Sequence, residues 1–138
     1  MSITSQEKEL VVQSFLKLSI DIDRTAEIFY GRLFKTLPDA RPLFESTDMR
    51  EQGRILMRML DSSVESLSNP DVLHEQMTVL GKRHVGYGVV PAHYKSFGEA
   101  LLWTVEEVLG EDYKPEIGMA WAKAFQMLAD IAIAAAEE

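Results

Sequence analysis

The chain has 138 residues and carries 14 Lys and Arg against 22 Asp and Glu, a formal net charge of −8 at pH 7. This length suits one domain with a buried core, and 46% hydrophobic with 26% charged residues exclude a disordered or fibrous chain. The acidic balance argues against binding to nucleic acids or anionic membranes. The chain has no cysteine, which excludes disulfides, thiol catalysis and cysteine-ligated metals.

The N-terminal segment MSITSQEKEL lacks the basic stretch and apolar run of a secretion signal. No uninterrupted apolar stretch reaches the roughly 18 residues of a membrane-spanning helix. We therefore expect a cytoplasmic protein that forms one domain over residues 1–138.

Helix-start signals and prolines divide the first half of the chain into helical segments. Thr4 followed by Glu7 forms a capping box, which predicts a helix from there to about residue 20. A second helix is expected over about 23–36. Proline at position 38 opens a short helical piece that ends near residue 44.

The same signals predict the helices of the second half. Asp48 with Glu51 three residues later is a second capping signal, and Asn69 stands before a proline at the first helical position. The expected helices cover about 48–67, about 70–86 with an end signal at Gly86-Tyr87-Gly88, and two further stretches opened by the prolines at 91 and 115. The sequence therefore predicts an all-α domain of six to seven helices.

Common cofactor and metal motifs are absent from this sequence. A dinucleotide fingerprint beginning at Gly86 and Gly88 would need a third glycine where Pro91 stands, and no strand is predicted before it. There is no phosphate-binding loop. The three histidines form no paired-ligand motif, and none has Glu three residues before it, so a zinc or di-iron site is not expected.

One histidine stands out by its position. Leu73, Met77, Leu80 and His84 follow one another at helical spacing, so His84 ends an apolar stripe and should face the core. Two interpretations remain open on these residues. His84 is either a buried histidine bonded to a backbone carbonyl, or an axial ligand of haem iron, which needs one neutral imidazole in an apolar pocket. The other two histidines are expected to be solvated.

A second helix presents a polar residue to the same side as its apolar face. Gln52 lies one turn before Leu56 on that face. Gly53 is a glycine inside a helix, which predicts that another backbone passes close by, and Ala26 is a suitable partner. Tyr30, one turn after Ala26, would then point toward Gln52. The alternatives are that Gln52 reaches solvent and that Tyr30 is an ordinary core tyrosine.

Together these positions resemble the globin family over nearly the whole chain. The residues that carry the resemblance are FYGRLF at 29–34, Pro38 and PLF at 42–44, LGKRH at 80–84, YKSFGEALL at 94–102 and AWAKAF at 120–125. Tyr30, Gln52 and Leu56 are similar to the distal triad of flavohaemoglobins and related single-domain bacterial globins. The separation between Gln52 and His84, 84 − 52 = 32 residues, is similar to theirs as well.

The resemblance implies haem b as cofactor and His84 as the proximal iron ligand. It implies apolar pocket walls from Phe44, Leu56, Leu80, Val89, Val90, Phe97 and Leu101. Arg83, Lys82 or Arg54 would reach a haem propionate, the alternative being solvated surface charges. Tyr94 matches the tyrosine that flavohaemoglobins link to the proximal histidine. Their linked glutamate is either absent here or displaced to Glu137.

The resemblance also implies reversible binding of dioxygen, with Tyr30 and Gln52 as donors to it, and of carbon monoxide and nitric oxide. No reductase domain follows residue 138 in this sequence, so conversion of nitric oxide to nitrate would depend on a separate reductase. The alternative is a non-enzymatic oxygen carrier, store or sensor. A helical interaction module without a cofactor is a third hypothesis.

Overall fold

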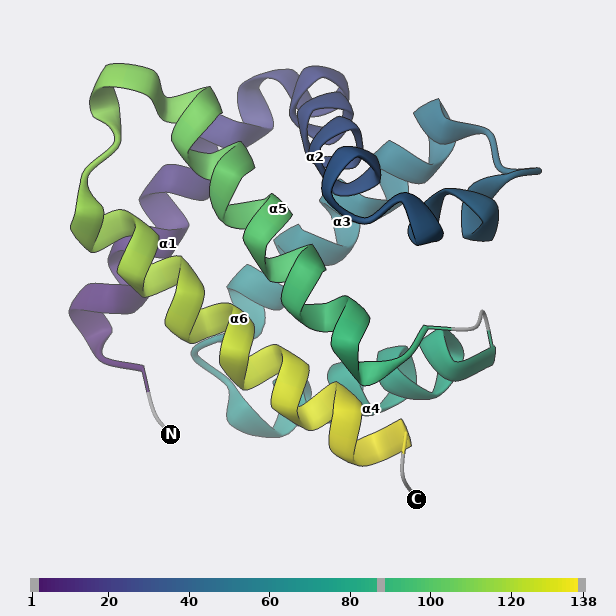
Figure 1. Ribbon diagram of the computed structural model, residues 1–138. Coiled ribbons are helices and arrows are strands. Elements are labelled where there is room, and N and C mark those ends of the chain that lie inside the picture. The colour runs from purple at the N-terminus through teal and green to yellow at the C-terminus, as the bar shows by residue number, and fades with distance from the viewer. Residues whose placement is uncertain (1–2, 87–88, 137–138) are drawn as a thin grey trace.

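The computed structural model describes residues 3–86 and 89–136, and all regular structure in these ranges is helical (Figure 1). Tyr87, Gly88 and Glu137, named above, lie outside the described residues. The elements are α1 Ser5–Leu18, the 3₁₀ turn η1 Ser19–Asp21, α2 Ile22–Thr36, η2 Pro38–Phe44, α3 Met49–Ser66, α4 Pro70–Gly86, α5 Pro91–Leu109, η3 Gly110–Asp112 and α6 Pro115–Ala136. The predicted all-α fold is confirmed.

The helix starts follow the predicted capping residues. The Thr4 hydroxyl accepts from the Glu7 backbone N–H at 3.1 Å, and the Glu7 carboxylate accepts from the Thr4 N–H at 2.9 Å. The Asp48 carboxylate accepts from the backbone N–H groups of Arg50 and Glu51 in the first turn of α3. The first helix ends two residues earlier than predicted, because Asp21 accepts from the Arg24 N–H and so starts α2.

The helices form a bundle in which α5 and α6 run antiparallel across the front of the molecule (Figure 1). Two polar contacts attach α1 to α6. The Trp121 indole N–H donates to the buried Ser14 hydroxyl at 2.8 Å, and the Lys123 ammonium lies 3.0 Å from the Glu7 carboxylate. Helix α2 packs against α3 and α5, so the two halves of the chain meet in one core.

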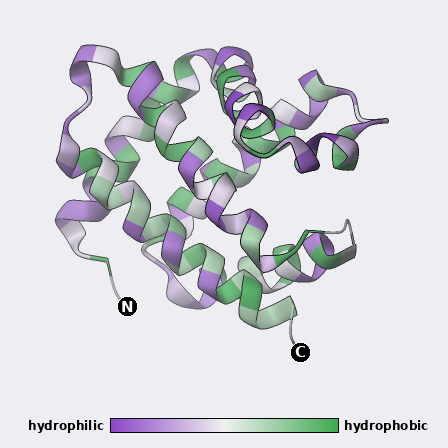
Figure 2. Ribbon diagram, in the orientation of Figure 1, coloured by the Kyte–Doolittle hydropathy of each residue, from purple (hydrophilic) through white to green (hydrophobic). Residues whose placement is uncertain are grey.

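The last helix, α6, is long and apolar enough to cross a membrane, by length and composition alone. It packs against α1, α4 and α5. Its buried alanines allow close approach of those helices, and at Gly81 of α4 an added Cβ would overlap the backbone of Ala132. Figure 2 shows hydrophobic residues recurring along the helices between hydrophilic ones, as expected for helices with one buried face.

Candidate functional site

The site begins where α2 and α3 cross. A Cβ built on Gly53 would lie 2.7 Å from the Ala26 Cβ, closer than side-chain carbons pack. The predicted close approach of these two residues is therefore confirmed. Because the two helices touch here, residues one turn further along α2 and one position earlier on α3 face each other.

Those facing residues are Tyr30 and Gln52. The Gln52 amide Nε2 donates to the Tyr30 hydroxyl oxygen at 3.1 Å. Tyr30 is 8% exposed and Gln52 is half-buried. Burial raises the pKa of the Tyr30 phenol, and the hydrogen bond from Gln52 opposes that shift in part. Tyr30 is thus a neutral hydroxyl at physiological pH, and its polar end meets Gln52 instead of the surface.

Three phenylalanines hold the Tyr30 ring. Its centroid lies 5.0 Å from that of Phe29 and 5.4 Å from that of Phe44, both edge-to-face, and 5.8 Å from that of Phe34. Such aromatic pairs are worth about 0.5–1.5 kcal/mol each beyond their buried area. Phe44 is a predicted pocket residue, whereas Phe29 and Phe34 have no predicted role, although Phe29 is adjacent to Tyr30 and Phe34 lies one turn after it on α2.

His84 lies in the last turn of α4 and is half-buried. Its Nδ1 is 3.0 Å from the Tyr94 hydroxyl oxygen, so a phenol and not a backbone carbonyl is its partner. Burial lowers the pKa of the imidazole, which favours the neutral form. In the described part of the chain no hydrogen bond reaches Nε2, and a neutral imidazole nitrogen without a partner suits a metal.

Tyr94, near the start of α5, is itself buried. It packs in a small cluster with Ala129 and Ala132 of α6, and the half-buried Leu80 borders that cluster. Burial raises the pKa of the Tyr94 phenol, which therefore stays neutral. The imidazole of His84 is thus oriented by a neutral phenol in an apolar setting.

The predicted pocket walls divide into three groups. Leu56 and Leu101 are buried, and Phe44, Leu80, Val89 and Phe97 are half-buried. Leu101 also borders an apolar cavity of about 20 Å³ shared by α1, α3 and α6, so it belongs to the main core. Val90 is 48% exposed at the start of α5. It caps α5, and its backbone N–H donates to His93 Nδ1 at 3.2 Å.

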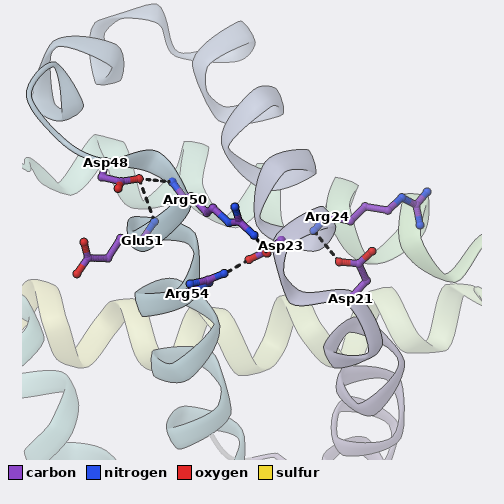
Figure 3. A network of polar contacts seen from close by, with 7 residues as sticks. All are labelled: Asp21, Asp23, Arg24, Asp48, Arg50, Glu51 and Arg54. Carbon is purple, nitrogen blue, oxygen red and sulfur yellow. Dashed lines mark hydrogen bonds and ion pairs between the residues drawn. The ribbon is translucent and has the colours of Figure 1, made fainter.

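The basic residues predicted near a haem propionate and the two histidines predicted to be solvated differ in their surroundings. The Arg54 Nε donates to the Asp23 carboxylate at 3.4 Å, so this guanidinium is engaged by α2 (Figure 3). Arg83 and Lys82 are exposed on α4. His74 is exposed as expected. His93 is half-buried, and its Nδ1 accepts from the Val90 backbone N–H at the exposed start of α5.

Within residues 3–86 and 89–136, no group of three or more His, Asp or Glu side chains is arranged to hold a metal ion. His84 is a single imidazole with one free nitrogen. A metal at this position would have to arrive with most of its own ligands, as iron does in haem. The residues present therefore fit a haem better than a bare metal ion.

The fold and the site define an all-α protein with two polar pairs. Tyr30 and Gln52 share a hydrogen bond where α2 and α3 cross, and His84 of α4 meets the phenol of Tyr94. A family model described as Globin matches residues 27–132. This match covers more than half of the chain, and the chain belongs to the globin family.

Curated relatives and a solved structure agree with this assignment. The chain is 30% identical over 131 residues to the flavohemoprotein of Rhizobium meliloti (strain 1021), which covers 94% of this chain and 32% of that protein. It is 29% identical over 133 residues to the flavohemoprotein of Deinococcus radiodurans, covering 95% of this chain and 33% of that protein. The chain thus spans about a third of the length of these relatives.

The solved structure is that of a hexacoordinated heme protein from an anhydrobiotic tardigrade, determined at pH 4. It superposes with a TM-score of 0.89 over 99% of this chain and 96% of that chain, at 16% sequence identity. At this identity the likeness shows the fold alone. The fold predicted from the sequence is thereby confirmed.

Proposed function

We propose that the chain binds haem b through His84 and reversibly binds dioxygen beside Tyr30 and Gln52. The observation that carries the proposal is the pair of contacts at the two sites, one at 3.1 Å between Gln52 and Tyr30 and one at 3.0 Å between His84 and Tyr94. A bound haem would supply a ferrous iron that takes diatomic gases.

Tyr30 and Gln52 are arranged to donate hydrogen bonds to a small polar ligand. Because the Tyr30 oxygen accepts from Gln52, the phenol proton points elsewhere, and the Gln52 amide keeps a second N–H. Both donors sit beside buried apolar residues, where a hydrogen bond is stronger than in water. Each contributes roughly 1–1.5 kcal/mol, about ten-fold in ligand retention.

On the other side, Tyr94 fixes which imidazole nitrogen is available. Its hydroxyl occupies His84 Nδ1, leaving Nε2 for iron. Partners of this kind orient a metal-bound imidazole and typically change metal affinity about 10–100-fold when they are lost. A phenol orients the ring but carries no charge, so it raises the basicity of the imidazole less than a carboxylate would.

Among residues 3–86 and 89–136 this neutral phenol is the partner of His84, and an oxygen carrier, store or sensor is the first candidate function. The second candidate is nitric oxide dioxygenation with a separate reductase as electron donor. It is supported by the likeness to two proteins named flavohemoprotein, of which this chain matches about a third. Dioxygen, nitric oxide and carbon monoxide are the ligands proposed for both functions.

Haem binding is tested by comparing the chain with His84→Ala after reconstitution with iron protoporphyrin IX. We expect a Soret band and one haem per chain for the parent, and loss of stable haem for His84→Ala in buffer without imidazole. His74→Ala removes an exposed histidine from the same helix and is the matched control. Equal haem content and equal ferrous spectra for His84→Ala would contradict the assignment.

The two candidate functions separate in one kinetic experiment. Nitric oxide is added to the oxygenated protein together with a chemical electron donor, and nitrate is counted per haem. A carrier yields about one nitrate per haem and then stops, because the iron is not restored fast enough. Formation of many nitrate ions per haem over the same period would establish the dioxygenase function.

A further inference from the structure

Three contacts in a row join α2 to α3. The contact made by Asp23, at the N-terminal end of the row on α2, has no role in the proposed function so far. Asp23, Ala26 and Tyr30 lie at i, i+3 and i+7 on one face of α2. Ala26 meets Gly53, and Tyr30 meets Gln52. Asp23 lies at the N-terminal end of this row and meets two arginines of α3.

Those arginines are Arg50 and Arg54, and they lie two residues before and two residues after Gln52. The Arg50 guanidinium is 3.5 Å from one Asp23 carboxylate oxygen, and Arg54 Nε is 3.4 Å from the other (Figure 3). One carboxylate thus joins two consecutive turns of α3, on either side of the glutamine. Arg24, the next residue of α2, takes part only through its backbone N–H, which Asp21 caps.

Asp23 is placed to restrain the orientation of α3 at the end of the row. The contact at Ala26 and Gly53 is apolar and acts as a pivot, because it fixes the distance between the helices but not the rotation of α3 about the contact. The rotation decides where the Gln52 amide lies relative to the Tyr30 hydroxyl. Besides the packing of α3 against α1 and α4, the rotation is restrained by polar contacts to α2: the ion pairs at one end of the row and the Gln52 hydrogen bond at the other.

We infer that Asp23 is a positioning residue, which sets Gln52 against Tyr30 through Arg50 and Arg54 and makes oxygen retention sensitive to ionic strength. The inference rests on the proposed function of the Tyr30 and Gln52 pair. The ion pairs are solvated, with side-chain exposures of 36% for Asp23 and 72% and 47% for the arginines. Salt screens such pairs, whereas it leaves the buried Tyr30 hydroxyl unaffected.

The main test is the rate of oxygen dissociation from the haem-loaded chain with Asp23→Asn. We expect an increase of about three-fold at low salt, the size of a solvated ion pair's effect. Carbon monoxide dissociation should change much less, because carbon monoxide gains little from a hydrogen bond. Asp23→Glu keeps the charge and should restore most of the parent rate. Raising sodium chloride to 1 M should bring the parent toward Asp23→Asn and leave the variant unchanged.

Matched controls separate positioning from a general loss of stability. Asp112→Asn removes another solvated ion pair, to Lys17 at 3.0 Å, far along the chain from α3. Asp21→Asn removes a charge from the same end of α2 but keeps a capping side chain. Both should leave oxygen dissociation at the parent rate, at low and at high salt.

A double-mutant cycle ties the effect to the glutamine. In a Gln52→Leu background, Asp23→Asn should no longer change oxygen dissociation, since no amide remains to be positioned. A readout independent of gas kinetics is the side-chain amide resonance of Gln52 in the carbon monoxide form, assigned by its loss in Gln52→Leu. We expect that resonance to shift in Asp23→Asn and to stay in place in Asp112→Asn.

Defined outcomes would overturn the inference. A parent-like oxygen rate and an unmoved Gln52 resonance in Asp23→Asn would show that the ion pairs do not position the glutamine. Equal changes for oxygen and carbon monoxide would show an effect on pocket access. If instead Gln52→Leu and Tyr30→Phe both kept the parent oxygen rate, the proposed function of that pair would fail, whatever Asp23 does.

Discussion

At the scale of single residues, two buried tyrosines differ in their hydrogen-bond partners. Tyr30 accepts from an amide and keeps its proton, while Tyr94 binds an imidazole nitrogen. Burial raises the pKa of both phenols, so both are neutral. In the proposed function the first acts on a diatomic ligand and the second orients the histidine. Removing either hydroxyl should therefore have different kinetic consequences.

Tyr30→Phe removes one hydrogen-bond donor and almost no volume. We expect oxygen to dissociate about ten-fold faster, because a bond of roughly 1–1.5 kcal/mol is lost. Carbon monoxide dissociation should change far less, since that ligand is less polar. Stopped-flow measurement of both rates checks this, with Gln52→Leu acting in the same direction. Similar acceleration of both gases would mean that the ring shapes access and does not donate.

Tyr94→Phe removes the partner of His84 Nδ1 and leaves the distal pair intact. We expect haem loss to accelerate roughly ten-fold, because a metal-bound histidine without its orienting partner typically loses about 10–100-fold in affinity. The ratio of oxygen to carbon monoxide dissociation rates should stay at the parent value. Transfer of haem to an excess of an apo-globin acceptor measures the loss. A changed gas ratio with unchanged haem retention would contradict the division of roles.

At the scale of helices, glycine and alanine decide how the elements carrying the site meet. Gly53 against Ala26 brings α2 to α3, and Gly81 against Ala132 brings α4 to α6. Each glycine is within three residues of a proposed site residue, Gln52 or His84. Close contacts of backbone are costly to separate, so the small residues fix the site as much as the polar ones do.

A matched pair of substitutions tests this at one crossing. Gly31 and Gly53 are both inside helices, but an added Cβ at Gly31 meets nothing within 4 Å, whereas at Gly53 it meets Ala26. Gly31→Ala should raise the melting temperature, because alanine is favoured over glycine inside a helix by about 0.5–1 kcal/mol of folding free energy. Gly53→Ala should lower it, since overpacking costs about 1–3 kcal/mol. Ala26→Gly in the Gly53→Ala chain should recover part of the loss. Equal shifts for both glycines would contradict the close crossing.

Helix starts were predictable from the sequence because capping is local. Thr4 with Glu7 and Asp48 act within three residues of themselves, and each starts a helix as predicted. The end of α1 was missed, since it depends on Asp21 capping the next helix. The meeting of Tyr30 with Gln52 was also predictable, because Gly53 marked the crossing.

At the scale of the whole molecule, the contact partners of long side chains could not be predicted from the sequence. Asp23 reaches Arg50 and Arg54 only because two helices cross at a particular angle, and Arg32 lies 3.9 Å over the Trp103 ring for the same reason. Helical spacing along one element carries no information on such partners. Helical spacing leaves the partner of Arg54 undetermined, whereas the fold places Asp23 beside it.

One long-range contact joins the two ends of the fold and gives it a pH dependence. The Glu7 carboxylate accepts from the Thr4 backbone N–H at 2.9 Å and from the Lys123 ammonium at 3.0 Å, which ties the start of α1 to α6. The bond from the Thr4 backbone lowers the pKa of Glu7 most, followed by the bond from Lys123. A carboxyl whose pKa is depressed by folding stabilises the fold above its unfolded pKa. This stabilisation is lost as pH falls through the folded value.

We therefore expect Glu7→Gln to melt at a lower temperature than the parent at pH 7, and the difference to shrink as pH falls from about 5 to about 3. Glutamine at this position can still complete the capping box, so the substitution removes the charge more than the cap. The check is thermal unfolding followed by circular dichroism at several pH values. Adding Lys123→Gln to Glu7→Gln should produce no further pH dependence in that range. A melting difference that stays constant from pH 7 to pH 3 would show that the ionised carboxylate does not tie α1 to α6.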